Sequence, residues 1–211
     1  MPSTPLLTAQ DLDCRRGRRY LFRDLAFSLG AGQMLQVAGR NGSGKSTLLR
    51  SLCGLTRLER GVIAWRGVSI GAGRDAFNAE LAYLGHAGAL KEELSAHENL
   101  LAALDVAGRP CTAQDAARVL DELGLAACAA LPARLLSQGQ RRRVALARLW
   151  LSGSASLWVL DEPFVALDAE ASEALRRVLA AHLDNAGVLV LTTHQLIDVA
   201  PARTQYLRLD A

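Results

Sequence analysis

"GRNGSGKST", from Gly39 to Thr47, is the stretch that decides the fold of this 211-residue chain. Its glycines, lysine and first hydroxyl fill the fixed places of the pattern G-x-x-x-x-G-K-[ST]. Glycines at these places let the backbone curl until successive N–H groups point at phosphate oxygens. The stretch therefore predicts a phosphate-binding loop. Its residues are Gly39, Arg40, Asn41, Gly42, Ser43, Gly44, Lys45, Ser46 and Thr47.

The residues on either side of this loop support the same interpretation. The apolar run "MLQVAG" (34–39) reads as a buried strand, and an apolar-faced helix is expected from Lys45 onward. The start of that helix would add the positive end of its dipole to the loop's donors. In such a loop Lys45 reaches the β- and γ-phosphates of a nucleotide, and the Ser46 hydroxyl takes one Mg²⁺ position.

Two further apolar strands end in polar residues. "LWVLDEP" (157–163) ends in Asp161 and Glu162, and acids at the end of a buried strand are unfavourable unless they have cationic partners. Asp161 suits Mg²⁺, and Glu162 is placed to polarise a water that attacks the γ-phosphate. "GVLVLTTH" (187–194) ends in His194, which should emerge at the carboxyl edge of the sheet. We expect His194 to contact the γ-phosphate and to hold Glu162.

The distribution of apolar runs predicts the architecture. Continuous apolar strands that alternate with helices indicate a mainly parallel sheet covered on both faces, here a P-loop NTPase core of the α/β class. Residues 1–31 read as short strands of an antiparallel part. We expect one domain in three stretches: 1–75 as β part and phosphate-loop core, 76–151 as an inserted helical subdomain, and 152–211 as the rest of the core.

Composition excludes several classes of protein. The net charge of +3 is too small to argue for nucleic acid, and the arginine runs 15–19 and 141–143 read as solvated faces. The 4 cysteines are scattered, which favours neither a zinc site nor a disulfide framework. We see neither a secretory signal nor a run of apolar residues long enough to span a bilayer. If the protein works at a membrane, we expect another chain to do the spanning.

"LSQGQ" (136–140) opens a helix with a polar cluster that contains no lysine, metal ligand or nucleophile. A helix N-terminus carries unpaired N–H groups and a partial positive charge, so it attracts an anion. Taken alone, Ser137 reads equally well as an ordinary cap of its own helix. The five residues by themselves do not say whose anion is bound.

The order of these motifs resembles the ATP-binding subunits of ABC transporters over nearly the whole chain. "LSQGQ" is similar to the signature LSGGQ of that family, with Gln138 in place of its first glycine. The resemblance implies an ATP-dependent homodimer in which Ser137, Gly139 and Gln140 of one copy meet the γ-phosphate held by the other. It also implies that Asp168, in "VALD", lies in a loop that crosses the dimer seam. ATP and Mg²⁺ are the implied ligands.

Two positions depart from the general family pattern. His86, in "YLGHAG", stands where most members have a glutamine that senses Mg²⁺ and the attacking water. We expect His86 to fill that catalytic role, with a charge that titrates near physiological pH. The aromatic residue that usually stacks on adenine is absent, and Arg15 or Arg16 lies there instead. A guanidinium plane can stack on a base, whereas Tyr20 is expected to belong to the following strand.

"YLGH", "LARLWLS" and "TTHQ" resemble the subgroup of ABC subunits that energises haem export in cytochrome c maturation. This implies a peripheral protein on the cytoplasmic face of the bacterial inner membrane, docked on separate integral membrane subunits. Haem is then involved only indirectly, either as transported substrate or on a chaperone that ATP releases. The motifs equally fit another ABC importer or exporter, and less well a soluble ABC ATPase. A GTPase is excluded because no N-K-x-D base reader is present.

Overall fold

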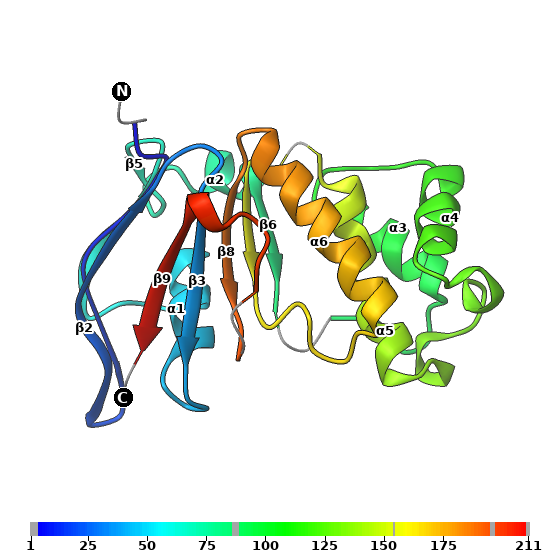
Figure 1. Cartoon of the computed structure of the whole chain (residues 1–211), viewed down its shortest axis with the longest axis horizontal. Coiled ribbons are helices and arrows are strands. Elements are labelled where there is room, and N and C mark those ends of the chain that lie inside the picture. The colour runs from blue at the N-terminus through cyan, green and yellow to red at the C-terminus, as the bar shows by residue number, and fades with distance from the viewer. Residues whose placement is uncertain (1–3, 86–88, 154, 195–196, 210–211) are drawn as a thin grey trace. The chain divides into compact units, whose positions relative to one another are not determined.

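Two β-sheets and several helices make up the computed structural model, which describes residues 4–85, 89–153, 155–194 and 197–209 (Figure 1). In this part of the chain a five-stranded sheet has the order β6-β7-β8-β3-β9, and a four-stranded sheet has the order β2-β1-β4-β5. The pairs β7–β8, β3–β8 and β3–β9 are parallel. β1 pairs antiparallel with β2 and with β4. The expected α/β class, with a mainly parallel sheet and an antiparallel part, is confirmed.

The strands are β1 (Leu7–Arg16), β2 (Arg19–Leu29), β3 (Met34–Gly39), β4 (Arg60–Trp65), β5 (Val68–Ser69), β6 (Leu81–Leu84), β7 (Leu157–Leu160), β8 (Val188–Thr192) and β9 (Thr204–Leu209). The α-helices are α1 (Lys45–Leu52), α2 (Arg74–Glu80), α3 (Ala96–Val106), α4 (Ala113–Glu122), α5 (Gln138–Ala147) and α6 (Ala169–Asp184). Short 3₁₀ segments are η1 (Ala126–Cys128), η2 (Ala133–Leu135), η3 (Arg148–Leu151) and η4 (Pro201–Arg203).

The chain divides into two compact units, and each is described by itself. The first unit comprises Met1–Tyr83, Ala155–Pro163 and Leu179–Ala211, and it contains nearly all of both sheets. The second unit comprises Leu84–Ser154 and Phe164–Val178, and it is helical. The segment Phe164–Val178 thus groups with the helices of the second unit, although it was expected to belong with the core.

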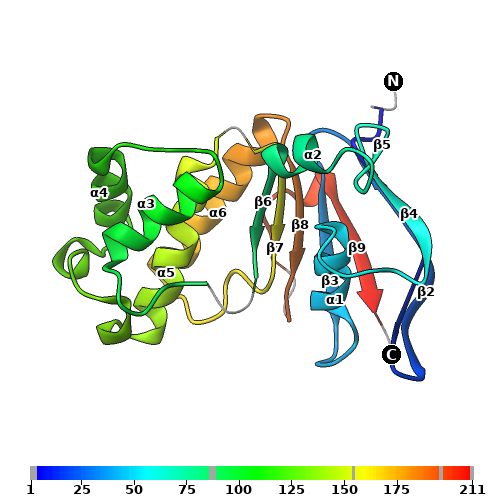
Figure 2. The ribbon, with the colours of Figure 1, turned by 180° about the vertical axis from the view of Figure 1, so that it is seen from behind.

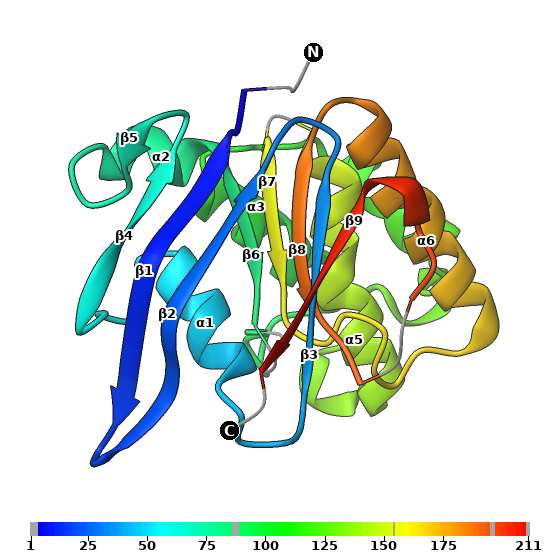
Figure 3. The ribbon, with the colours of Figure 1, turned by 60° about the vertical axis from the view of Figure 1, so that its left-hand side comes forward.

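The core of the first unit forms around α1, which lies between the two sheets (Figures 2 and 3). Every residue of β7 and of β8 is buried, as their continuous apolar sequences require of central parallel strands. The inner face of α1 carries Leu48, Leu49 and Leu52, which pack in the same cluster as β1, β3, β7 and β8. This packing holds the start of α1 at the carboxyl end of β3.

The second unit is a group of capped helices around its own apolar cluster. Ser95 begins α3 with a capping box, in which its side chain accepts from the Glu98 N–H and its own N–H donates to the Glu98 carboxylate. Thr112 caps α4 by accepting from the N–H of Asp115. The apolar faces of α3, α4 and α5 meet, with Leu100, Leu104 and Leu120 among the fully buried residues.

The helix that begins at "QGQ" ends in a tighter turn. α5 ends at Ala147, and Arg148–Leu151 continues as the 3₁₀ segment η3. The Ser152 hydroxyl donates to the Arg148 carbonyl oxygen at 2.6 Å and so satisfies one of the unpaired carbonyls at this end. Tightening into a 3₁₀ turn is common at helix termini, and no glycine or proline marks the change in the sequence.

His182, near the end of α6, lies against the parallel sheet of the first unit. Its imidazole stacks on the Trp158 indole of β7, with ring centroids 4.0 Å apart and planes 10° apart. Its Nε2 is 3.2 Å from the Val188 carbonyl oxygen, which places the ring proton on Nε2. Burial lowers the pKa of His182, and the hydrogen bond to Val188 opposes that shift. The folded state therefore favours the neutral ring.

We predict that the free energy of unfolding decreases as the pH falls below about 6.5, the usual pKa of histidine in an unfolded chain. In that range the unfolded state binds a proton that folded His182 does not bind, and the loss ends below the lowered folded-state pKa. Urea unfolding at a series of pH values measures this step. The His182→Gln variant should lack it, and equal pH dependence in both proteins would contradict the prediction.

Candidate functional site

The phosphate loop joins β3 to α1 through residues 40–44, and its shape depends on glycine. Gly39, Gly42 and Gly44 have φ values of 149°, 80° and 103°, which residues with side chains rarely adopt. A Cβ on Gly39 would also run into the Leu209 carbonyl oxygen and the Ser43 hydroxyl. Only glycine allows the backbone to pass this close to β9. The structure thus gives a physical reason for the glycine spacing.

The start of α1 has the features of an anion site. Gly44 is the N-cap and has no side chain to occupy the first N–H groups of the helix, and no acidic residue lies in the first turn. The Ser43 hydroxyl is buried and has no hydrogen-bond partner among the described residues. A buried hydroxyl beside uncapped N–H groups is unfavourable unless a polar ligand satisfies it, and a phosphate would do so.

Lys45 is folded back into the loop. Its Nζ donates to the carbonyl oxygens of Gly39 at 2.8 Å and Arg40 at 3.2 Å, and the residue is only 6% exposed. These contacts hold the ammonium group against the first two residues of the loop. A phosphate entering the loop would offer the ammonium a charged acceptor in place of two neutral ones, which strengthens each hydrogen bond.

Asp161, Glu162 and His194 come together at the carboxyl ends of β7 and β8, as their positions in the sequence predict. The Nε2 atom of His194 lies 2.8 Å from Oε1 of Glu162. The Glu162 side chain is 15% exposed and that of His194 is 45% exposed. The carboxylate is therefore largely sheltered, whereas the imidazole that holds it can be reached from solvent. Asp161 is buried.

Thr192 is a member of this cluster that the sequence analysis did not single out. Its hydroxyl donates to Oδ1 of Asp161 at 2.6 Å and accepts from the backbone N–H of Glu162 at 2.8 Å. The signal was present in "LTTH": a polar side chain at the end of an apolar strand needs a buried partner. Which partner it has depends on strand pairing that the sequence does not show.

The oxygen donors of the first unit fit a magnesium ion. Asp161 offers a buried carboxylate, and Ser46 offers a hydroxyl on the first turn of α1. Mg²⁺ is bound in such sites by one or two protein oxygens together with substrate phosphates and water. Within residues 4–85, 89–153, 155–194 and 197–209, no group of three or more His, Cys, Asp or Glu is placed to hold a metal. Any Mg²⁺ here would depend on the nucleotide for the rest of its ligands.

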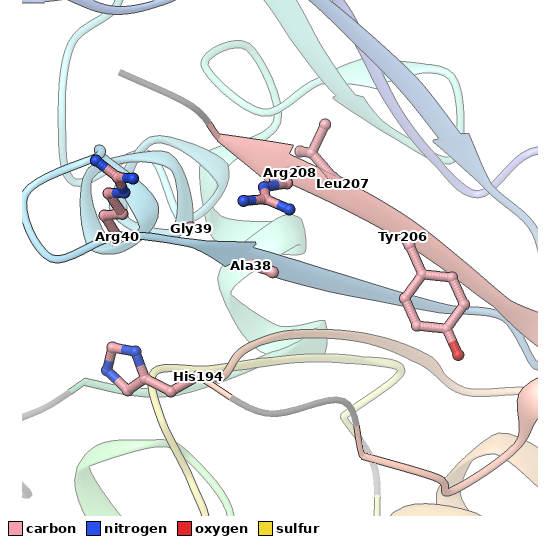
Figure 4. A pocket seen from close by; sticks show the side chains of 7 residues that line it. All are labelled: Ala38, Gly39, Arg40, His194, Tyr206, Leu207 and Arg208. Atoms are coloured by element: carbon pink, nitrogen blue, oxygen red, sulfur yellow. The ribbon is translucent and has the colours of Figure 1, made fainter.

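A pocket of about 550 Å³ lies beside the phosphate loop of the first unit (Figure 4). The ends of β3 and β9 form one side, and His194 stands across from them. Arg40 and Arg208 lie in its wall, and their guanidinium groups suit an anionic ligand. The residues that line it are Ala38, Gly39, Arg40, His194, Tyr206, Leu207 and Arg208.

The β1–β2 hairpin places Arg15 and Arg16, the two alternatives for the adenine contact, in different surroundings. Arg15 pairs with Tyr20, and the guanidinium carbons of Arg15 and Arg23 lie 5.2 Å and 3.7 Å from the centroid of the Tyr20 ring. Arg15 is therefore engaged in a stack within the hairpin. Arg16 pairs with Arg19.

The face that carries Arg16 is the one that meets the phosphate loop. A register shift in the hairpin leaves Leu21 as an extra residue of β2, and a Cβ on Gly44 would lie 3.0 Å from the Leu21 Cβ. Arg16 is two residues after Cys14 on β1 and so shares its face, and Cys14 and Leu21 pack in the same apolar cluster. The register therefore favours Arg16 as the base contact.

In the second unit, Ser137 caps α5. Its hydroxyl accepts from the Gln140 N–H at 3.2 Å, and its own N–H donates to the Gln140 side-chain oxygen at 2.8 Å. This capping box occupies the Gln140 side chain, but a hydroxyl that accepts one hydrogen bond keeps its proton to donate. Gly139 lies against the Ala166 carbonyl oxygen, 3.2 Å from where a Cβ would stand.

Asp168 lies at the start of α6. Its Oδ1 accepts from the Ala171 N–H at 2.8 Å, and its Oδ2 is 3.9 Å from the Arg143 guanidinium. Within one chain it therefore acts as a helix cap with a weak ion pair. Its expected role at a dimer seam stays a prediction. His86 lies outside the described residues, so its catalytic role also stays a prediction.

Comparisons with known proteins give three results. A profile of the ABC transporter family matches residues 22–165. The chain is 48% identical over 97% of its length to the whole "Cytochrome c biogenesis ATP-binding export protein CcmA" of Dechloromonas aromatica. It is 51% identical over 92% of its length to the protein of the same name from Aromatoleum aromaticum, covering 90% of that protein.

Solved structures agree on the fold. An ATP-binding subunit of an ABC transporter superposes with a TM-score of 0.82 at 26% identity, over 98% of this chain and 88% of that one. A dimeric ATP-binding cassette in a post-hydrolysis state, with bound ADP and Pi, gives a TM-score of 0.81 at 22% identity, over 98% of this chain and 97% of that one.

Proposed function

This chain belongs to the ABC transporter family, and from that membership we propose that it is the ATP-hydrolysing subunit of an export complex in cytochrome c biogenesis. The complex would export haem or use ATP to release a haem-loaded chaperone. The observation that carries the enzymatic part is the 2.8 Å contact between His194 and Glu162, beside a loop shaped for phosphate. The shared name of relatives at 48% and 51% identity supports the cytochrome c part.

The residues of the first unit have different roles in hydrolysis. The N–H groups of the glycine loop and Lys45 bind the phosphates and hold the terminal phosphorus atom in place. Glu162 accepts a proton from a water as its oxygen attacks the γ-phosphorus, and the bond from that phosphorus to the β,γ-bridging oxygen breaks. The products are ADP and inorganic phosphate. His194 holds the Glu162 carboxylate toward the attacking water.

Asp161 and Ser46 would hold Mg²⁺. When bound, the ion neutralises charge that develops on the phosphate oxygens. The donor set of one carboxylate and one hydroxyl is small, so binding of the ion is expected to require the nucleotide. Asp161 is buried, and a divalent cation beside it would offset the cost of burying a carboxylate charge.

The helix tip of "LSQGQ" completes the site in a homodimer. The Gly139 N–H of one copy, with the Ser137 hydroxyl proton, would bind the γ-phosphate that the other copy holds through Lys45. Gln140 supports this tip through the capping box. ATP then contacts both copies and favours the closed dimer, because a ligand shifts an equilibrium by its differential affinity for the two states. Loss of the γ-phosphate lets the copies separate.

The partners of this dimer would be separate integral membrane subunits, with the chain peripheral on the cytoplasmic face of the bacterial inner membrane. Across the described part of the chain, no helix is both long enough and apolar enough to cross a bilayer. Purification of the tagged chain from membranes, with identification of the co-purifying integral proteins and assay of ATP-driven haem movement, tests the proposal. Partners that carry another substrate would point to a different ABC importer or exporter.

The Arg16→Ala variant is expected to bind ATP about fivefold more weakly, because a guanidinium stacked on a base contributes about 1 kcal/mol. Arg15→Ala is the matched control, since Arg15 stacks on Tyr20 in the hairpin. Equilibrium binding of a fluorescent ATP analogue measures both. Equal weakening by the two substitutions would indicate a charge effect of the hairpin, not a stack on the base.

His86 is proposed to take the place of the glutamine found in most family members. We expect His86→Gln to keep the ATPase rate and His86→Ala to lower it about 100-fold, the lower end of the range for a group that assists proton transfer. Steady-state phosphate release on all three proteins is the measurement. The same rate in all three would rule the role out.

A further inference from the structure

The Thr192 hydroxyl joins the two acids that follow β7. We propose that Thr192 is a positioning residue that holds the base Glu162 in a fixed position relative to the metal-binding carboxylate of Asp161. The role of Thr192 in catalysis rests on the proposed ATPase function, whereas its two hydrogen bonds belong to the fold. Thr192 itself touches neither the nucleotide nor the attacking water in this scheme.

The direction of the two hydrogen bonds is fixed by their chemistry. An ionised carboxylate only accepts, so the Thr192 proton must point at Oδ1 of Asp161, 2.6 Å away. The Thr192 oxygen then has lone pairs left, and one accepts from the Glu162 N–H at 2.8 Å. The Thr192 hydroxyl thus accepts a hydrogen bond from the Glu162 backbone and donates one to the Asp161 carboxylate. The short distance to Asp161 is typical of a hydrogen bond to a charged oxygen.

Strand register brings the Thr192 hydroxyl beside the residues that follow β7. β7 and β8 are parallel with Leu160 opposite Leu191, so Asp161 and Thr192 are the next residues along each strand. Thr192 also pairs with Val37 of β3, the strand that leads into the phosphate loop. It is fully buried between these strands. A β-branched side chain in such a place has little rotamer freedom, so the hydroxyl is held in one direction.

Glu162 needs such an anchor because its backbone is strained. Its φ of 49° lies in the left-handed region, which is unfavourable for a residue with a side chain. The Thr192 oxygen holds the Glu162 N–H, and His194 holds the Glu162 carboxylate. The base is therefore fixed at its backbone and at its head group. Release of the backbone contact would let Glu162 relax toward ordinary φ values and move its carboxylate.

The test compares Thr192→Val, which removes the hydroxyl and keeps the branched shape, with Thr192→Ser, which keeps the hydroxyl. Thr204→Val is the control, since the Thr204 hydroxyl bonds the Ala200 carbonyl oxygen at the opposite end of the same sheet. In the nucleotide-free full-length chain, the Glu162 amide should exchange with solvent about tenfold faster in Thr192→Val than in the parent. Thr192→Ser and Thr204→Val should leave that rate unchanged.

The same variants are then assayed with ligands. Thr192→Val should lower kcat about 10- to 100-fold with KM for ATP within about threefold of the parent, because it misplaces the base without touching the phosphate loop. Its affinity for Mn²⁺, measured by magnetic resonance with a non-hydrolysable ATP analogue, should fall about threefold or more, because Asp161 loses its hydroxyl partner. Thr192→Ser should restore both values to within about threefold.

Three results would overturn the inference: an unprotected Glu162 amide in the parent protein, unchanged amide exchange in Thr192→Val, or a Thr192→Ser protein as impaired as Thr192→Val. The first needs no variant, so poor folding of Thr192→Val does not remove the test. Amide exchange and Mn²⁺ affinity do not depend on turnover. If the parent did not hydrolyse ATP, the proposed function would fail, and these two measurements would still decide the geometric role of Thr192.

Discussion

In the Glu162→Gln variant, we expect ATP turnover to fall by about 10²- to 10⁴-fold, the range for removal of a general base. An amide of the same shape can still accept a hydrogen bond from Nε2 of His194, so the local geometry is retained. ATP affinity should therefore stay close to that of the parent. Because the γ-phosphate persists, we expect ATP to hold the variant as a closed dimer.

Phosphate release, equilibrium ATP binding and size-exclusion chromatography in ATP measure the three parts of this expectation. Glu59→Gln is the control, because Glu59 is an exposed acid of the same unit. It should turn over ATP at the parent rate. If Glu162→Gln did the same, Glu162 would not be the base.

The second large effect is complementation between two inactive variants. Lys45→Ala removes the ammonium from the phosphate loop. Gly139→Asp puts an anion at the tip of α5, where it suits the helix dipole but repels a phosphate. We expect each variant alone to lose ATP hydrolysis by at least about 100-fold, since each breaks both composite sites of its own dimer.

An equal mixture of the two should regain about a quarter of the parent rate. Half of the randomly paired dimers are then mixed, and each mixed dimer has one site with an intact phosphate loop and an intact helix tip. Steady-state phosphate release after mixing, with ATP present, is the measurement. No recovery from two folded variants that still dimerise would contradict the shared site, as would a fully active protein that stays monomeric in ATP.

The local parts of the fold and of the site followed from the sequence. The glycine loop, the strand before it and the helix after it lie where "MLQVAGRNGSGKST" places them, because their signals are short-range: an apolar run, glycines at fixed spacing and leucines on one helical face. The convergence of Asp161, Glu162 and His194 was also predicted, since parallel strands bring their carboxyl ends to one edge. The role of each residue in catalysis stays a prediction.

Other elements gave no usable local signal. α2, β6 and β9 were not predicted. β6 has four residues that follow α2 without a turn, so only its place in the sheet marks it as a strand. β9 is half exposed at the edge of its sheet, which weakens its apolar pattern. The 3₁₀ ending of α5 has no breaker residue.

The sequence by itself determined the local elements: the glycine loop between a strand and a helix, and the two acids that follow a buried strand. Only the tertiary structure decided how residues far apart in the chain are combined. It assigned Thr192 to both Asp161 and Glu162, engaged Arg15 with Tyr20, and put Arg16 on the face of Leu21. The reason is physical: such pairings depend on strand register and on one extra residue in a hairpin, and a shift of one position turns every side chain to the opposite face.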